Sequence, residues 1–516
     1  MTLTTTTTTT MTTKWTMPMT VTAPTPSPVF GPGVAGRRTA PVLCPSRYQL
    51  VQLGMQGSLS VQDQPHGSRR ASGSSESKPL PSGCVQVNSL ALLLKRETGL
   101  GDPGCSGFSR SQRQHLTVLP SGLPTTPCRL MDSMDSRAYI GQFSRDGAFF
   151  VVGYQDQRVR LYDVEEGWKL RKDVRARGIR WTITDTCVSP DQRYLLYASI
   201  NPTVHLVAVG SGGSDSVVES VANITEVHEA LDFDPSRHTF GIWSVRWSGD
   251  GREIIAGTNN RSVYIYDLGE SKVVARVAGH ADDVNAVEYL DSSPNIIVSG
   301  SDDAFIKVWD RRTLDSGNRR RARAVGVLVG HLEGLTHLNS RGDGRHFISN
   351  SKDQSVKMWD IRLGMRSEAE AAALPEGGVP TFNWDYRMMA YPAAGRHIRH
   401  PYDASIMTYK GHSVRQTLIR AYFSPAHTTG QSLIYSGSAD NNIHIWSAVT
   451  GRHQATLSHH CSLVRDVSWH PTKPMIASVS WDGSVVAWGT TRDAGRLFGG
   501  SALPPRQRMQ DRMGGW

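Results

Sequence analysis

Short runs in which apolar and polar residues alternate recur along the middle of the chain, and each run closes on an aromatic residue. Two of them belong to a repeated phrase, which reads SDDAFIKVWDRR at 301–312 and SKDQSVKMWDIR at 351–362. Alternation with a period of two predicts strands with one buried face. The closing position falls at residues 162, 266, 309, 359, 446 and 488, with a valine in the same place at 207.

The intervals between these positions predict the architecture. They are 45, 59, 43, 50, 87 and 42 residues, and a period of 40–45 residues is typical of four-stranded propeller blades. The two long intervals predict insertions near 208–238 and 363–408. The predicted fold class is therefore all-β, a seven-bladed β-propeller over residues 136–489. Because no blade can bury its faces alone, the seven blades form one domain.

A propeller ring closes when a strand from the other end of the chain completes the last sheet, which removes an open edge. Residues 115–121, HLTVLPS, are predicted to supply that strand to the seventh blade. Residues 490–498 are the alternative.

Polar residues recur at fixed distances before the aromatic position. An aspartate lies six residues before it, a serine lies four residues before the aspartate, and Gly-His pairs open three blades. This pattern resembles the WD-repeat family, in which His, Ser, Asp and Trp form a buried hydrogen-bonded staple in each blade. The resemblance implies three such sets: His280, Ser299, Asp303 and Trp309; His331, Ser349, Asp353 and Trp359; and His412, Ser436, Asp440 and Trp446. A hydrolase needs a single Ser-His-Asp set, so the repetition favours a structural role over catalysis.

Composition separates the ends of the chain from its middle. The net charge of +10 divides into +6 for residues 1–135, +3 for 490–516 and +1 for the residues between them. A nucleic-acid groove needs charge clustered on the folded surface, so no direct nucleic-acid partner is expected. Residues 1–84 are predicted to be a disordered low-complexity leader, with a transit peptide as the alternative for the Thr-rich start. Residues 85–135 are predicted to hold a short helix, a linker and the possible closing strand, and 490–516 a flexible basic tail.

The reactive side chains predict no cofactor and no metal. The six cysteines lack the spacing of zinc ligands and are expected as free thiols in a reducing compartment. His397 and His400 suggest a metal site only weakly, because the sequence places no further ligands beside them. No apolar run reaches the ~20 residues of a membrane-spanning helix, so no membrane partner is expected.

Both copies of the repeated phrase end in Trp-Asp-x-Arg, with the arginines at Arg312 and Arg362. In a propeller these arginines lie in the turn after the third strand of adjacent blades, on one rim. A planar guanidinium there suits a carboxylate or carbonyl of a partner, and an exposed turn arginine without a role is the alternative. A third copy, Trp384–Arg387, follows no alternating strand and is predicted to lie in an insertion loop.

Trp-Asp-x-Arg after strands of this form resembles the motif of WD-repeat substrate receptors of cullin-RING ubiquitin ligases. Segments such as SRAYIGQFSRDG and IRWTITDTCVSPDQRYLLYASINPTVHLV extend the resemblance to the factor-eleven branch of the adaptor- and cullin-four-associated factors and its plant relatives, over about 136–489. The resemblance implies docking on the damaged-DNA-binding adaptor of cullin-four through Asp310, Arg312, Asp360 and Arg362. A leucine-rich helix at Ser89–Leu100 would either add to this docking or pack on the propeller itself.

The sequence therefore predicts a non-catalytic substrate-recognition subunit of a cullin-four RING ubiquitin ligase. It would bind protein substrates whose identity the sequence does not give, and it would promote ubiquitin transfer through proximity. A general propeller scaffold in a chromatin or RNA complex is the alternative. RRRAR at 319–323 is either a nuclear import signal or a solvated loop, and we expect the chain in the nucleus and cytoplasm.

Overall fold

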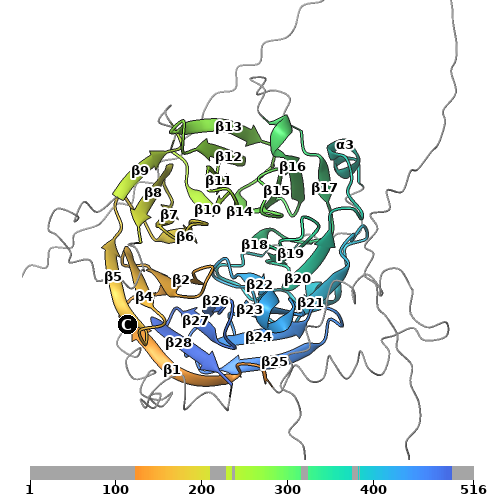
Figure 1. Cartoon of the computed structure of the whole chain (residues 1–516). Coiled ribbons are helices and arrows are strands. Elements are labelled where there is room, and N and C mark those ends of the chain that lie inside the picture. The colour runs from red at the N-terminus through yellow and green to blue at the C-terminus, as the bar shows by residue number, and fades with distance from the viewer. Residues whose placement is uncertain are drawn as a thin grey trace, which may run out of the picture. The chain divides into compact units, whose positions relative to one another are not determined.

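Seven antiparallel four-stranded sheets surround a common axis (Figure 1). This is a computed structural model, and it describes residues 122–209, 228–234, 239–314, 323–374, 382 and 384–490. The prediction of a seven-bladed β-propeller is confirmed. The predicted leader, the helix at 89–100, the strand at 115–121 and the tail beyond residue 490 lie outside the described residues, as does RRRAR apart from Arg323.

The strands follow one another around the ring in chain order. Blade 1 holds β2 (Ala138–Phe143), β3 (Phe149–Tyr154), β4 (Arg158–Asp163) and β5 (Lys169–Arg175), and blade 2 holds β6 (Ile183–Val188), β7 (Tyr194–Ser199), β8 (Thr203–Ala208) and β9 (His228–Asp232). Blade 3 holds β10 (Ile242–Trp247), β11 (Glu253–Thr258), β12 (Ser262–Asp267) and β13 (Lys272–Ala278), and blade 4 holds β14 (Val284–Tyr289), β15 (Ile296–Ser301), β16 (Ile306–Asp310) and β17 (Gly326–Leu328). Blade 5 holds β18 (Leu335–Ser340), β19 (His346–Ser351), β20 (Ser355–Asp360) and β21 (Met407–Lys410), and blade 6 holds β22 (Ala421–Phe423), β23 (Leu433–Gly437), β24 (Asn442–Ser447) and β25 (His453–Ser458). Blade 7 holds β26 (Val464–Trp469), β27 (Ile476–Ser480), β28 (Ser484–Gly489) and β1 (Thr126–Ser133).

Short helical turns lie between strands. They are η3 (Arg311–Thr313), α3 (Glu368–Ala372), η4 (Ala393–His397) and α4 (Ala426–Thr429). Figure 1 shows the first strand of each blade nearest the axis and the fourth strand at the perimeter. Side chains on the first strands therefore meet around the central channel.

The aromatic residue that closes the third strand fixes the packing between blades. In blades 4 to 7 it is a tryptophan no more than 1% exposed, at Trp309, Trp359, Trp446 and Trp488. Each indole lies in an apolar cluster with side chains of the preceding blade, as Trp309 does with Ile255 and Val263. The apolar positions that give each strand its alternation are thus buried between blades, which is why the blades depend on one another.

An N-terminal strand closes the ring, as predicted, but the predicted residues were wrong. β1 (Thr126–Ser133) pairs antiparallel with β28, so the fourth-strand position of blade 7 belongs to 126–133 rather than to 115–121 or 490–498. The folded domain therefore begins before residue 136. Most of β1 is partly buried, without clean alternation, and its pairing with β28 shifts register twice. Periodicity could not distinguish such a strand from the linker.

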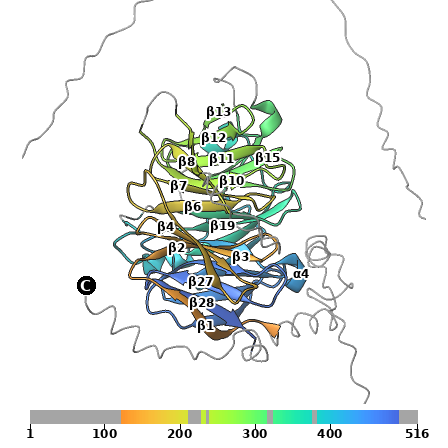
Figure 2. The ribbon, with the colours of Figure 1, turned by 60° about the vertical axis from the view of Figure 1, so that its left-hand side comes forward.

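Asp132 of β1 joins the last blade to the first. Its carboxylate accepts hydrogen bonds from the hydroxyl of Tyr154 at 2.8 Å, from Arg160 Nη1 at 2.8 Å and from the hydroxyl of Tyr162. β1 lies beside β28 in blade 7, whereas the three donors belong to blade 1 (Figure 2). One carboxylate therefore links the two blades between which the ring closes.

The first strands share a bulge near one end. Six of the seven shift register there, and the extra residue is Tyr139, Thr184, Trp243, Asn285, Thr336 or Arg465. A bulge re-aims the side chain of its extra residue. Thr184 Oγ1 donates to the carbonyl of Ile242 at 2.6 Å, and Asn285 and Thr336 donate likewise to Leu335 and Ile419. Three of the bulges thus tie blades 2, 4 and 5 to a carbonyl of the next blade around the channel.

Candidate functional site

The turns divide between two faces of the ring. The turns after the first and third strands of a blade lie together, as the bond from Val164 N to Ala148 O shows, and we call this the arginine face because it carries Arg312 and Arg362. The other turns form what we call the histidine face, which carries His280 and His331. The arginines of the motif and the histidines of the staples thus lie at different ends of the blades.

Arg312 is exposed and pairs with the aspartate of its own motif. Its side chain is 70% exposed, and its Nε and Nη2 lie 2.9 and 2.7 Å from the two oxygens of Asp310. The same carboxylate caps η3 by accepting from the backbone N–H of Arg312. Hydrogen bonds from Arg312 lower the pKa of Asp310, so the carboxylate stays ionised. Asp310 thus holds the turn and the guanidinium in a defined position.

Arg362 occupies the matching place in blade 5, but its aspartate is fully buried. Asp360 accepts from the backbone N–H of Arg362 at 3.0 Å and from Nε of Arg345 at 2.6 Å. The Arg362 side chain is 62% exposed, with Nε 3.8 Å from Asp360. The prediction that Asp360 itself touches a partner does not fit its burial, because Arg345 and the backbone occupy it. Its role is to position Arg362.

The third Trp-Asp-x-Arg forms a similar turn on the other face. Asp385 accepts from the backbone N–H of Arg387 at 2.9 Å, as Asp360 does from Arg362. Among the described residues, no strand lies between β20 and this turn, in agreement with the predicted insertion loop. The carbonyl of Tyr386 bonds to Gln416, in the segment between blades 5 and 6, which places this copy on the histidine face. The Trp-Asp-x-Arg motif alone therefore does not determine on which face of the ring its arginine lies.

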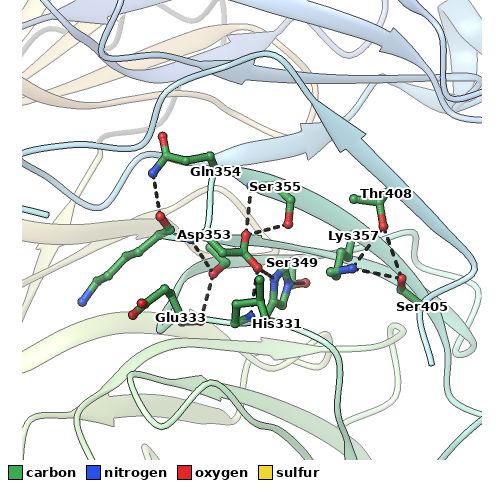
Figure 3. Close-up of polar contacts among 12 residues, drawn as sticks. His331, Glu333, Ser349, Asp353, Gln354, Ser355, Lys357, Ser405 and Thr408 are labelled. Atoms are coloured by element: carbon green, nitrogen blue, oxygen red, sulfur yellow. Dashed lines mark hydrogen bonds and ion pairs between the residues drawn. The ribbon is translucent and has the colours of Figure 1, made fainter. Parts of the chain in front are cut away.

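Blades 4 and 5 contain the complete staple that the repeated residues implied. In blade 5, His331 Nδ1 lies 2.9 Å from Asp353 and Nε2 lies 2.6 Å from Ser349 Oγ, while the indole N–H of Trp359 donates to the same hydroxyl at 2.7 Å (Figure 3). In blade 4 the same three distances, among His280, Asp303, Ser299 and Trp309, are 2.9, 2.7 and 2.8 Å. Burial raises the pKa of Asp353, but the interaction with His331 outweighs it and the pKa lies well below its usual value.

Blade 7 contains a staple whose histidine the sequence reading missed. His460 lies 2.7 Å from Ser478 Oγ and 3.3 Å from Asp482, and the indole of Trp488 donates to Ser478 at 2.8 Å. The spacing of Ser478, Asp482 and Trp488 is the sequence pattern that indicates a staple in blade 7. The histidine follows another histidine rather than a glycine, so a search for Gly-His passed over it.

The staple predicted for blade 6 is wrong. His412 Nε2 bonds to Asn350 of blade 5 at 2.9 Å, and Asp440 pairs with His444 at 2.8 Å. Ser436 and Trp446 donate instead to backbone carbonyls, those of Arg420 and Lys410. Ser436, Asp440 and Trp446 have the spacing of blades 4 and 5, but His412 lies 24 residues before its serine rather than 18 or 19, and each of the four residues has another partner.

Charged side chains of the first strands fill the centre of the ring. Asp185 accepts from Arg246 Nη1 and from Arg420 Nη2, both at 2.6 Å, and Arg420 Nη1 lies 3.4 Å from Asp466. Burial favours the protonated form of Asp185, but the two arginines outweigh it and lower its pKa. The network joins blades 2, 3, 6 and 7 through the axis. Such a set is stable only when each charge has a partner, as here.

An aromatic cluster lies where the channel meets the histidine face. The ring of Tyr139 lies 5.9 Å from Trp181 and 5.5 Å from Trp481, and the guanidinium of Arg137 lies 4.6 Å from the Trp481 ring. Trp181 is 48% exposed, which is unusual for so large an apolar side chain. Exposed tryptophan beside arginine is typical of protein-binding surfaces.

Among the described residues, no group of three or more His, Cys, Asp or Glu side chains could hold a metal ion. Helices long and apolar enough to cross a membrane are absent from the same part of the chain.

Comparison with known proteins agrees with this architecture. The WD domain, G-beta repeat family matches residues 233–267, 271–310, 322–360, 404–447 and 451–489. The LEC14B homolog of Prunus armeniaca is 46% identical over 433 residues, which cover 83% of this chain and 86% of the relative. DDB1- and CUL4-associated factor 11 homologs of Caenorhabditis elegans and Caenorhabditis briggsae are 32% and 30% identical, covering 77% and 74% of this chain and 66% and 68% of theirs. The chain belongs to this WD-repeat family.

The five matched repeats end with the third strands of blades 3 to 7. Blades 1 and 2 lie outside those matches and complete the ring with less regular sequence, such as Val207 in the aromatic position. Family membership therefore agrees with the repeat architecture.

Proposed function

We propose that the chain is a non-catalytic substrate-recognition subunit of a cullin-four RING ubiquitin ligase. Its Caenorhabditis relatives are named as factors associated with DDB1 and CUL4, the adaptor and the cullin. The observation that carries the proposal is the pair of exposed arginines, Arg312 and Arg362, which matching turns of adjacent blades present on one face. A guanidinium fork there can bind a carboxylate or carbonyl of the adaptor.

The two arginines are not equivalent. Arg312 already uses Nε and Nη2 on Asp310, whereas Arg362 Nε lies 3.8 Å from Asp360 and leaves most of its N–H groups available. Arg362 therefore contributes the larger share of the docking energy. Asp310 and Asp360 act through the arginines they position.

Protein substrates bind on the histidine face, in this proposal. The adaptor occupies the arginine face, so the opposite turns stay open, and they carry the exposed Trp181 in the same aromatic cluster as Trp481, over which Arg137 lies. The rigid ring holds the two faces in a fixed relation. Ubiquitin transfer is then accelerated because the substrate stays close to the ligase. We propose the nucleus and cytoplasm as the location, testable by fractionation.

The test is capture of the purified adaptor by the full chain and by an Arg312→Ala/Arg362→Ala variant. Wild type should bind, and the variant should lose at least tenfold in affinity, about 1.4 kcal/mol, without a change in melting temperature. Arg362→Ala alone should account for most of the loss. Arg387→Ala is the matched control, because it removes an arginine from the same motif on the histidine face and should bind as wild type does.

The outcomes separate the candidate functions. Absence of capture by wild type would reject the ligase role and leave the general propeller scaffold. Equal capture by wild type and the double variant would reject docking through these arginines and direct attention to the leucine-rich segment at 89–100.

A further inference from the structure

The insertion after the third strand of blade 5 encloses a pocket. The pocket has a volume of about 440 Å³ and lies between strands β20 and β21 and the segment 397–400. Residues of the RHIRHP sequence at 396–401 line this pocket, and the proposed docking function assigns no role to that sequence. Pockets of this size are typical of small ligands or of one side chain from a larger partner.

A buried ion pair anchors the insertion against the blade. Lys357 Nζ lies 2.6 Å from Asp403 Oδ2, and the two side chains are 5% and 1% exposed. A Cβ at Gly330 would lie 2.5 Å from Asp403 Oδ1, so a glycine is needed for the close approach. The same ammonium donates to Thr408 Oγ1 at 3.1 Å and lies 3.4 Å from Ser405 Oγ (Figure 3). The pocket wall is therefore preorganised.

The carboxylates near the pocket already have partners. Asp403 accepts from Lys357, from Arg399 at 3.3 Å and from Ser405. Asp353 is occupied by the blade 5 staple and by Ser355. Neither carboxylate has a vacant position that would draw a cation into the pocket.

Three other lining residues, Lys410, His400 and Arg399, carry hydrogen-bond donors. Lys410 Nζ donates to the carbonyl of Arg396 at 2.8 Å, and in the described chain it pairs with no carboxylate. His400 accepts from the backbone N–H of Tyr402 through Nδ1, so the ring proton lies on Nε2 and can be donated. The side chain of Arg399 is 75% exposed at the same pocket. Three donors of different geometry thus surround one space.

We propose that this pocket binds a phosphoryl group. A phosphate monoester dianion has three terminal oxygens, enough for Arg399, His400 and Lys410 together, whereas a carboxylate has two. Phenylalanine, tyrosine and tryptophan are missing from the described lining, so a nucleobase would find no large aromatic stacking surface there. The ligand is therefore free phosphate or a phosphorylated serine or threonine side chain. This inference does not depend on the ligase role.

The test uses phosphorus NMR of inorganic phosphate and of O-phosphoserine titrated with the full chain. Both signals should broaden in a saturable way with wild type. Arg399→Ala/Lys410→Ala should weaken binding at least tenfold without a change in melting temperature. The matched control is Arg312→Ala/Arg362→Ala, which removes two positive charges from the arginine face and should bind phosphate as wild type does.

Each outcome decides one point. No broadening by wild type, or equal broadening by the pocket variant, would overturn the proposal. Tighter binding of O-phosphoserine than of phosphate would identify a phosphorylated side chain as the ligand, and equal binding would identify free phosphate. Adaptor capture by the pocket variant should be unchanged, so failure of this inference is distinguishable from failure of the ligase proposal.

Discussion

Blades 5 and 6 have the same spacing of Ser, Asp and Trp and each carries a histidine ahead of them, yet only blade 5 forms the staple. The residue two before the tryptophan differs between them. In blade 5 it is Lys357, which extends to Asp403, and in blade 6 it is His444, which takes Asp440. Competition for one carboxylate therefore decides whether the spacing becomes a staple.

The second difference lies between the blades. Asn350 of blade 5 accepts from His412 and thereby draws the blade 6 histidine away from its own serine. Its counterpart in blade 6 is Gly437, and in blade 4 it is Gly300. A single side chain in one blade thus changes the hydrogen bonds of the next.

The largest difference in stability between matched variants of blades 5 and 6 is expected at their aspartates. Asp353→Ala should destabilise the chain by about 3–5 kcal/mol, because it removes one partner of a buried pair and leaves His331 uncompensated. Asp440→Ala should cost below about 1 kcal/mol, because the Asp440 side chain is 37% exposed and its pairing is screened by solvent. Urea unfolding of both variants measures the difference, and equal costs would contradict the assignment of the two blades.

The serines should give a smaller difference. Ser349→Ala removes the shared partner of His331 and Trp359, so a loss of about 1–3 kcal/mol is expected. Ser436 bonds only to backbone carbonyls, so Ser436→Ala should cost about 0.5–1.5 kcal/mol. Ser478→Ala in blade 7 should behave as Ser349→Ala does. If Ser478→Ala lowers the free energy of unfolding as little as Ser436→Ala does, the assignment of a staple to blade 7 is contradicted.

The smallest effect concerns Glu333, beside the blade 5 staple (Figure 3). Burial and the nearby charge of Asp353 raise its pKa from 4.5 to about 7. As the pH rises from about 4.5 to 7, the unfolded chain releases this proton first, so the folded state loses stability. Glu333→Gln should therefore melt higher than wild type at pH 8 and equally at pH 4.5. Glu165→Gln, an exposed control, should match wild type at both.

Repetition made the fold predictable, because each blade repeats the same strand pattern and the spacing of Trp309 and Trp359 gives the period. The staples of blades 4 and 5 followed from that spacing. The hydrogen bonds of blade 6 did not, since His444 and Asn350 act across turns and blades that spacing does not describe. The residues of the closing strand were not predicted correctly, because β1 lacks the alternation of apolar and polar residues. The buried Asp360 is paired by Arg345, fifteen residues away in the turn before the neighbouring strand β19, which no local pattern indicates.

The pairing of Thr126 with Gly489 has a consequence for biosynthesis. β1 is the first strand of the domain to leave the ribosome, and its partner β28 is the last. The ring cannot be completed during translation, and the open edges of β1 and the early blades stay accessible to chaperones and to other nascent chains until residue 489 has emerged. A chain truncated before β28 would have at most six complete sheets and would leave β1 without its partner, so the ring could not close and quality-control proteases should remove the chain.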